Sequence, residues 1–217
     1  MLRFAEEIVL LTLRDEDGKF LSVPVMSMQH ALAGAVLMDL ALENRIDTDP
    51  ENLVLIDSTP VGDSLLDPTL EQIAAGEQHD ARHWVEQTAR QADEIREEAL
   101  ARLVERGILE QHDERFLWVF RSRRYPVIDG REEREVKLRI LGVLLSDEIP
   151  DPRDIVIICL ADACGILPQL LPKRELSGVR DRIEQVRKLD LIGQAMAQAI
   201  HDIELWLAAS RIEGRMF

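Results

Sequence analysis

The sequence predicts a mainly α fold: a single-domain helical bundle of core helices surrounded by amphipathic helices, with small β-hairpins. Aromatic residues make up only 4% of the 217 residues. Aliphatic residues dominate the apolar composition, which suits helices packed on helices better than stacked sheets. The length is near the upper end for one domain, and the sequence shows no internal repeats or low-complexity linkers. We therefore expect one domain over residues 1–217.

Helices and one hairpin are expected in the first half of the chain. Segment 28–43 is apolar around most of its circumference, so it belongs in the middle of the core, and Ser27 can cap it. A β-rich run at 53–56 follows turn residues and predicts a hairpin within 45–59. Gly107 is expected to end the last helix of this half. The helices are expected at 6–13, 28–43, 67–75, 81–91 and 93–106.

Beyond Gly107 the pattern changes to a second hairpin and then returns to helical spacing. Residues 108–110 and 116–120 are expected to pair around a polar turn at 111–114. The later helices are expected at 131–145, from Asp151-Pro152 through 160, at 177–189 and at 191–207.

Charge is distributed unevenly along the chain. The formal net charge is −15, and a strongly negative field disfavours the binding of nucleic acids. Segment 115–139 departs from this balance, because its basic residues outnumber its acidic ones. The basic residues are Arg115, Arg121, Arg123, Arg124, Arg131, Arg134, Lys137 and Arg139, against Asp129, Glu132, Glu133 and Glu135.

The densest part of this segment, residues 118–125, interleaves arginines with aromatic residues. Guanidinium groups bind phosphate bidentately, and aromatic rings settle at a lipid interface. Arg121, Arg123 and Arg124 are therefore candidates for binding lipid headgroups at an anionic membrane surface. In the alternative interpretation the aromatic residues belong to a core strand and the arginines pair with surface acids.

The strand expected at 116–120 has an apolar residue at every position, and Phe116, Trp118 and Phe120 alternate with two aliphatic residues. A strand with two apolar faces is either covered on both sides or takes part in an interface. This strand is the candidate for membrane insertion or for a homo-oligomer contact.

Three stretches of the first third have an unusual combination of residues, namely FAEEIVLLTLRDEDGK at 4–19, ALAGAVLMDLALENRI at 31–46 and TPVGDSLLD at 59–67. In this order and at this spacing they resemble the Golgi phosphoprotein 3 family. Matches of lower density continue to about residue 207. The chain has no basic tail before Phe4, and a bacterial-type member is expected.

The resemblance implies a non-catalytic adaptor that binds phosphatidylinositol 4-phosphate through a shallow basic pocket and recruits the cytosolic tails of Golgi glycosyltransferases. It also implies self-association through the hairpin. Matched residue by residue, one pocket arginine corresponds to Arg96. Asp93, Ala33 and Pro24 stand where the family has two further arginines and a tryptophan, so the pocket is only partly kept.

The remaining sequence patterns predict neither an enzyme nor a cofactor or metal site. Motifs for nucleophilic catalysis or phosphate loops are absent from the sequence. His79 and His83 lie four residues apart, which is a weak metal signal by itself, and they are expected at the surface near a helix start. Cys159 and Cys164 are expected to be buried, reduced thiols.

These observations predict a cytoplasmic protein that is peripheral at the cytoplasmic face of a membrane. Its expected partners are anionic phospholipids or phosphoinositides, client tails and further copies of itself. We expect no signal peptide and no membrane span, because apolar segment 31–42 is shorter than the roughly 20 residues that a span needs.

Two alternatives remain open at the level of sequence. The first is a soluble protein-interaction scaffold without lipid binding. The second is a winged-helix-like nucleic-acid-binding protein, with 93–106 as its recognition helix and 121–124 as its wing. The acidic residues along that helix count against the second alternative, because they would face a polyanion.

Overall fold

The computed structural model describes residues 1–14, 19–49, 51–116, 120–128, 130–189, 198 and 200–201, with the backbone alone for 113–116 and 120–124. These residues form nine helices and two separate antiparallel hairpins of two strands each. The predicted mainly α fold class is confirmed. The helices are α1 Phe4–Leu11, α2 Val25–Leu42, α3 Asp67–Ala75, α4 Ala81–Ala89, α5 Ala92–Glu105, α6 Arg131–Leu144, α7 Pro152–Ala163, α8 Leu167–Leu170 and α9 Lys173–Arg187, and the strands are β1 Ile46–Thr48, β2 Leu53–Leu55, β3 His112–Phe116 and β4 Phe120–Arg124.

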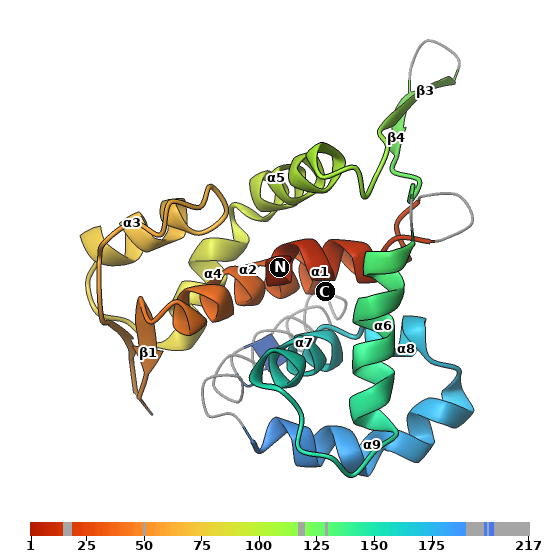
Figure 1. Ribbon diagram of the computed structural model, residues 1–217. Helices are drawn as coiled ribbons and strands as arrows, with labels where there is room; N and C mark the ends of the chain where they lie inside the picture. The colour runs from red at the N-terminus through yellow and green to blue at the C-terminus, as the bar shows by residue number, and fades with distance from the viewer. Residues whose placement is uncertain are drawn as a thin grey trace, which may run out of the picture.

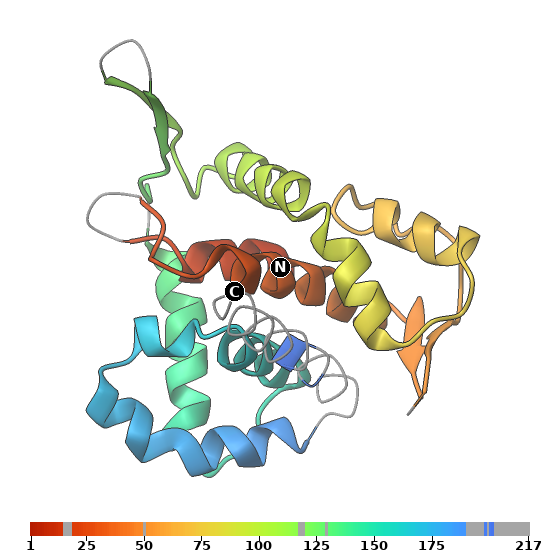
Figure 2. The same ribbon diagram turned by 180° about the vertical axis from the view of Figure 1, so that it is seen from behind.

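The helices are arranged in layers around α1 and α2. Figure 1 shows these two helices in the middle of the molecule, with α3, α4 and α5 on one side and α6 to α9 on the other. The view from behind in Figure 2 shows the same order. Helix α2 contacts α1, α4, α5 and α7, so it is the centre of the core.

The burial of α2 explains its composition. Every residue from 30 to 41 is buried, as the apolar residues around its circumference predicted. The 18 residues of α2 are long and apolar enough to cross a membrane by length and composition alone. However, 78% of them are buried inside the bundle. At Gly34 an added Cβ would lie 2.6 Å from the Leu160 Cδ2 of α7. Glycine therefore permits the close approach of the two helices at this point.

Most predicted helices are present, with boundaries that differ by a few residues. Helix α2 begins at Val25, directly after Pro24, and Ser27 lies buried inside its first turns. The predicted Ser27 cap is therefore wrong, because the fixed φ of proline starts the helix earlier. Helix α9 likewise begins directly after Pro172, ahead of the predicted residue 177. Most of the helix predicted at 191–207 lies outside the described residues.

Two other predicted helix boundaries, the cap at Asp151 and the stop at Gly107, agree with the structure. Asp151 caps α7 by accepting a hydrogen bond from the Arg153 N–H at 2.9 Å, with Pro152 in the first turn. Gly107 has a φ of +70° just after α5, which is the left-handed conformation that glycine adopts readily. Cys159 and Cys164 are buried and form no disulfide with each other, as predicted.

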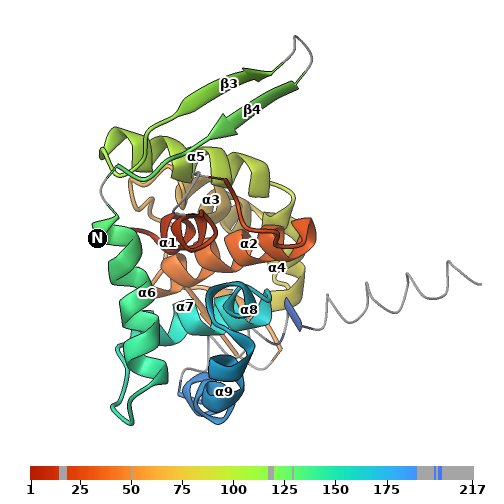
Figure 3. The ribbon, with the colours of Figure 1, turned by 90° about the vertical axis from the view of Figure 1, so that its right-hand side faces the viewer.

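The first hairpin agrees with the prediction, whereas the second does not. In the second hairpin β3 pairs with β4 so that His112 lies opposite Arg124 and Phe116 lies opposite Phe120. The predicted turn at 111–114 therefore belongs largely to β3, and Phe116 and Phe120, which were predicted in one strand, lie opposite each other on two strands. The prediction of a strand at 116–120 was wrong because this hairpin projects from the bundle (Figure 3). Neither face of a projecting hairpin has to be apolar and turned towards the core.

Candidate functional site

Arg96 on α5 lines a shallow pocket of about 120 Å³ between α5, the start of α2 and the segment before α2. Apolar side chains form most of its wall. The lining residues are Phe20, Leu21, Val23, Val25, Met28, Gln29, Leu32, Ala92, Asp93 and Arg96.

The charge of Arg96 is partly offset inside this pocket. Its Nη2 lies 3.1 Å from the Asp93 Oδ1. Its guanidinium carbon lies 5.9 Å from the ring centroid of Phe20, within cation–π distance. The Asp93 side chain is 75% exposed, so this ion pair is weak in water. An anionic headgroup that approaches Arg96 must compete with Asp93.

The other predicted cations lie on β4 of the projecting hairpin. The register places Arg121 opposite Arg115, and Arg123 opposite Asp113. Opposed residues, and residues two apart along a strand, share one face of a two-stranded ribbon. Positions 115, 121 and 123 therefore share a face with position 113, while Arg124 lies on the other face. One face thus gathers three arginine positions and one aspartate.

The aromatic candidates lie at the far end of the same hairpin. Phe116 and Phe120 form its last pair, at the end furthest from the helices in Figures 1 and 3. Trp118 lies outside the described residues. No described residue of β3 or β4 lines the Arg96 pocket. The structure therefore assigns the predicted cations to two separate elements.

A buried ionic cluster at the start of α1 was missed by the sequence reasoning. Glu6 and Glu7 on α1 and Asp39 on α2 are each at most 1% exposed. We call these three residues, together with Arg3, Asp63, Arg102, Arg139 and Arg153, the α1 ionic cluster.

The geometry of the cluster links elements that are distant in sequence. The Phe4 N–H donates to the Asp39 Oδ2 at 2.7 Å, and the Arg153 Nη1 lies 3.5 Å from the Asp39 Oδ1. The Arg139 Nη1 donates to the Glu7 Oε1 at 3.1 Å. These contacts join α1 and α2 to α6 and α7.

Asp63 extends the cluster to the other side of α1. Its carboxylate accepts hydrogen bonds from the Arg3 Nε at 2.8 Å and from the Arg102 Nη1 at 2.5 Å. The Arg102 Nε also lies 3.4 Å from the Glu6 Oε1. Asp63 and Arg102 thereby attach the loop before α3, and α5, to the first helix.

Burial raises the pKa of a carboxyl group, whereas pairing with an arginine lowers it, and both act in this cluster. Burial raises the pKa of Asp39 to about 7, although the Phe4 N–H and the nearby arginines act against it. Burial likewise raises the pKa of Glu7 against the hydrogen bond from Arg139. Asp63 differs, because the hydrogen bonds from Arg102 and Arg3 outweigh its partial burial and lower its pKa.

A model of the family described as Golgi phosphoprotein 3 (GPP34) matches residues 4–203. The chain belongs to the Golgi phosphoprotein 3 family. The resemblance drawn from the three N-terminal stretches is therefore confirmed.

Two relatives carry the name vacuolar protein sorting-associated protein 74. The protein from Eremothecium gossypii is 27% identical over 205 residues, covering 78% of this chain and 61% of the relative. The protein from Schizosaccharomyces pombe is 27% identical over 166 residues, covering 67% of this chain and 49% of the relative. The chain thus spans about half to three fifths of the length of these relatives.

The segments that mark the Golgi phosphoprotein 3 family supply the carboxylates of the α1 ionic cluster. Glu6 and Glu7 come from the first stretch, Asp39 from the second and Asp63 from the third. These residues hold helices together and do not line the Arg96 pocket. The signal available in the sequence was Asp39, an acid inside an otherwise apolar helix, because a buried carboxylate requires a partner.

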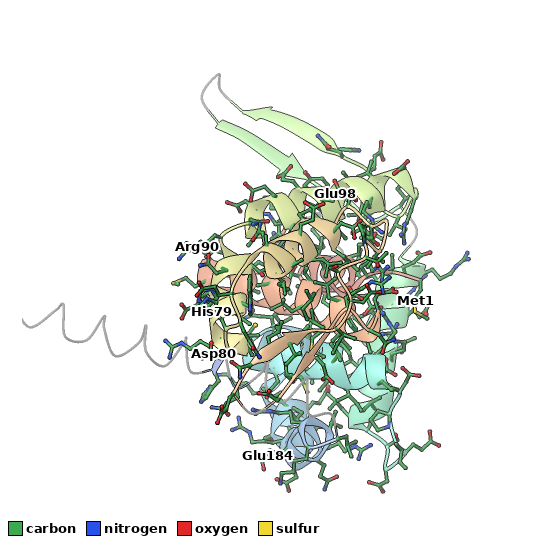
Figure 4. The ribbon with its side chains drawn as sticks, turned by 90° about the vertical axis from the view of Figure 1, so that its left-hand side faces the viewer. Met1, His79, Asp80, Arg90, Glu98 and Glu184 are labelled. Atoms are coloured by element: carbon green, nitrogen blue, oxygen red, sulfur yellow. The ribbon has the colours of Figure 1, made fainter. Side chains whose placement is uncertain are left out.

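The paired histidines lie at the start of α4. The rings of His79 and His83 stack with centroids 3.8 Å apart, and burial together with the neighbouring His79 lowers the pKa of His83. The Asp80 carboxylate caps α4 by accepting from the His83 N–H at 2.8 Å, and Figure 4 shows His79 beside Asp80 at the edge of the molecule. Among the described residues, no group of three or more His, Cys, Asp or Glu side chains could hold a metal ion.

Proposed function

We propose that this member of the Golgi phosphoprotein 3 family is a peripheral membrane protein that binds anionic lipid headgroups of the phosphoinositide class. It acts as a non-catalytic adaptor at the cytoplasmic face of the membrane and carries protein client tails. The β3–β4 hairpin carries the proposal. It projects from a chain of net charge −15 and carries three arginines on β4, of which Arg121 and Arg123 share a face with position 115 and Arg124 lies on the other face.

The mechanism combines electrostatic attraction with shallow insertion. A basic residue near an anionic surface contributes about 1 kcal/mol to binding, so the three arginines of β4 together contribute about 3 kcal/mol. The Phe116 and Phe120 pair at the end of the hairpin is placed to reach the interface between headgroups and acyl chains. The distance between this end and the helices keeps the acidic body away from the surface.

The Arg96 pocket supplies a second and weaker headgroup contact. Arg96 is the one charge-matched residue of the family's pocket, and Asp93 holds it at 3.1 Å. A bound phosphate would have to displace Asp93 and would also be repelled by it. The arginines of β4 therefore dominate the affinity, and Arg96 adds selectivity for a particular headgroup.

Vesicle co-sedimentation tests the role of the hairpin. Vesicles of phosphatidylcholine alone are compared with vesicles that also contain phosphatidylglycerol or phosphatidylinositol 4-phosphate. Replacing Arg121, Arg123 and Arg124 with alanine is expected to weaken binding to anionic vesicles roughly a hundredfold. The matched control replaces Arg82, Arg174 and Arg180, on α4 and α9, and changes the net charge equally. The control should bind almost as well as the wild type.

Substitutions at Asp93 test the pocket separately. Asp93→Arg places a second cation three residues before Arg96 and is expected to strengthen binding to phosphatidylinositol 4-phosphate vesicles by about tenfold or more. Glu94→Arg, on the neighbouring exposed position of α5, makes the same charge change outside the pocket. If the two variants gain equally, Arg96 is not a headgroup contact.

Two outcomes would remove the lipid function altogether. Failure of all anionic vesicles to bind the wild type at low salt would favour the protein-interaction scaffold. Strong binding of random duplex DNA at low salt would favour the winged-helix alternative. Against the second, Asp93, Glu94, Glu97 and Glu105 are exposed along α5, where a recognition helix would meet phosphate groups.

A further inference from the structure

The Arg96 pocket presents two opposite charges beside an apolar wall. Of the described residues that line it, the charged ones are Asp93 and Arg96, which lie three residues apart on α5 and therefore share one face of the helix. Gln29 adds a neutral amide, and the remaining lining residues are apolar. A ligand that fits this lining carries a negative group and a positive group close together.

The ion pair between Asp93 and Arg96 leaves both side chains able to form further hydrogen bonds. Its contact joins the Arg96 Nη2 to the Asp93 Oδ1 at 3.1 Å. A guanidinium has five N–H donors, and a carboxylate accepts about four hydrogen bonds. The side chains of Arg96 and Asp93 are 35% and 75% exposed, so a ligand can reach them. A phosphate therefore binds Arg96 without displacing Asp93, provided that a cation on the same ligand offsets the charge of Asp93.

These polar groups distinguish among phospholipid headgroups. An inositol phosphate adds negative charge and carries no group that pairs with Asp93. A choline group has no N–H to donate and is bound by proteins in aromatic cages. Phe20 is the one aromatic residue among the described lining residues, and its ring already lies within cation–π distance of Arg96. The primary ammonium group of ethanolamine, by contrast, donates charge-assisted hydrogen bonds to a carboxylate.

The apolar wall favours a membrane lipid over a free metabolite with the same polar groups. Val25, at the start of α2, is 73% exposed and lines the pocket together with Phe20 and Met28. When a lipid headgroup occupies the pocket, its glycerol and upper acyl carbons can cover these side chains and remove apolar surface from water. Free phosphoethanolamine has no such carbons and leaves the wall exposed.

We propose that the Arg96 pocket binds the phosphoethanolamine headgroup of a membrane phospholipid, with the phosphate on Arg96 and the ammonium group on Asp93. This inference rests on the proposed membrane function and names the ligand of its second, weaker contact. The arginines of β4 are attracted to any anionic surface, and the pocket then selects membranes that contain ethanolamine lipids. Both charges of the pocket are partly exposed to water, so one headgroup adds little affinity.

Co-sedimentation at constant surface charge tests this selection. All vesicles contain the same fraction of phosphatidylglycerol, and phosphatidylcholine is replaced stepwise by phosphatidylethanolamine. Because neither of these two lipids has a net charge, the attraction of the β4 arginines stays the same. The affinity of the wild type is expected to rise by about threefold to fivefold. An unchanged affinity, with binding to phosphatidylglycerol retained, overturns the ligand assignment but leaves the proposed membrane function intact.

Two substitutions on α5 separate the pocket from effects of lipid packing. Asp93→Asn should still bind phosphatidylglycerol vesicles but should lose the gain from phosphatidylethanolamine, because its amide has no charge to pair with the ammonium group. Glu94→Gln makes the same change of charge at an exposed position outside the pocket and should keep the gain. A gain that persists in Asp93→Asn arises from the packing of the lipids and overturns the proposal.

Measurements in solution test the pocket without a membrane. Short-chain phosphatidylethanolamine, below the concentration at which it forms micelles, should shift the NMR signals of the α5 amides near Arg96. Phosphatidylcholine of the same chain length should not shift them. This result is expected even if the wild type fails to bind anionic vesicles, an outcome that would remove the proposed membrane function alone.

Two results of the same titrations would count against the pocket assignment. Absence of a shift with short-chain phosphatidylethanolamine overturns it. Free phosphoethanolamine is the second probe, and it should require a much higher concentration, because it does not cover the apolar wall. Equal shifts from phosphoethanolamine and the short-chain lipid at equal concentrations would assign the pocket to a soluble ligand and overturn the assignment to a lipid.

Discussion

Asp39 lies inside a helix whose neighbouring residues are all buried. Its carboxylate accepts the Phe4 N–H and lies within 3.8 Å of both Arg3 and Arg153. These contacts do not fully compensate its removal from water, because burial still raises its pKa to about 7. Asp39 therefore positions α1 on α2 at a cost in stability that depends on pH.

Asp39→Asn should flatten the dependence of stability on pH. In the unfolded chain Asp39 has its ordinary pKa of 3.8, so between that pH and about 7 the folded state holds a proton that the unfolded state has lost. The contribution of Asp39 to the free energy of unfolding is therefore greatest below the pKa of the unfolded chain. It falls by about 1.4 kcal/mol for each pH unit as the pH rises through this window. Asparagine keeps an oxygen acceptor for the Phe4 N–H but does not titrate.

Urea unfolding near the two ends of this window measures the effect. Both proteins retain Glu7, whose raised pKa gives a slope of the same sign, so the difference between them isolates Asp39. The wild type is expected to lose more stability than the variant between about pH 5 and about pH 7. Equal losses in the two proteins would contradict the role assigned to Asp39.

At the scale of single elements, local signals predicted structure well where the chemistry is local. Proline and aspartate fix the start of α7, and Gly107 ends α5, because caps and left-handed turns depend on a few adjacent residues. The register of β3 and β4 was predicted wrongly, because the apolar run at 116–120 has the pattern of a buried strand. The structure pairs polar residues instead, at a position where neither face is required to be apolar.

Packing between α2 and α7 gives a prediction at this scale. Gly34→Ala is expected to destabilise the protein by about 1 to 3 kcal/mol, because the new methyl group would lie 2.6 Å from the Leu160 Cδ2. Gly178→Ala in α9 is the matched control, since nothing lies within 4 Å of its Cβ position. That control should stabilise the protein by up to about 1 kcal/mol, through its higher helix propensity. Thermal unfolding of both variants compares the two effects, and equal signs would show that the helices do not meet closely at Gly34.

At the scale of the whole molecule, the family resemblance correctly indicated the fold but not the reason for its motifs. The α1 ionic cluster joins residues as far apart in sequence as Glu7 and Arg139, and no local pattern reveals such a pairing. A sequence does not show whether a charged side chain lies at the surface or in a buried ion pair. An arginine of the segment 115–139 could therefore equally contact a lipid or pair with a carboxylate inside the protein. The structure divides them, with Arg139 paired to Glu7 and Asp154 and Arg121, Arg123 and Arg124 on the projecting hairpin.

This division of charge predicts how membrane binding depends on salt. Two opposing electrostatic forces act between the molecule and an anionic membrane. The arginines of β4 are attracted to the surface, and the helical part of the protein, which is acidic enough to give the chain a net charge of −15, is repelled by it. The screening length falls from about 10 Å at 0.1 M salt to about 3 Å at 1 M. The arginines act at close range, while the acidic body lies further from the surface.

Moderate salt should therefore screen mainly the repulsion of the more distant acidic helices. High salt should screen the attraction of the β4 arginines as well. Binding to phosphatidylglycerol vesicles is expected to vary little at low ionic strength and to fall steeply towards 1 M, where the attraction is screened. The variant without the three β4 arginines should bind weakly at all salt concentrations, because it lacks the attractive term. Co-sedimentation across a salt series measures both curves. Binding of the wild type that persists unchanged at 1 M salt would show that apolar insertion, and not charge, holds the protein on the membrane.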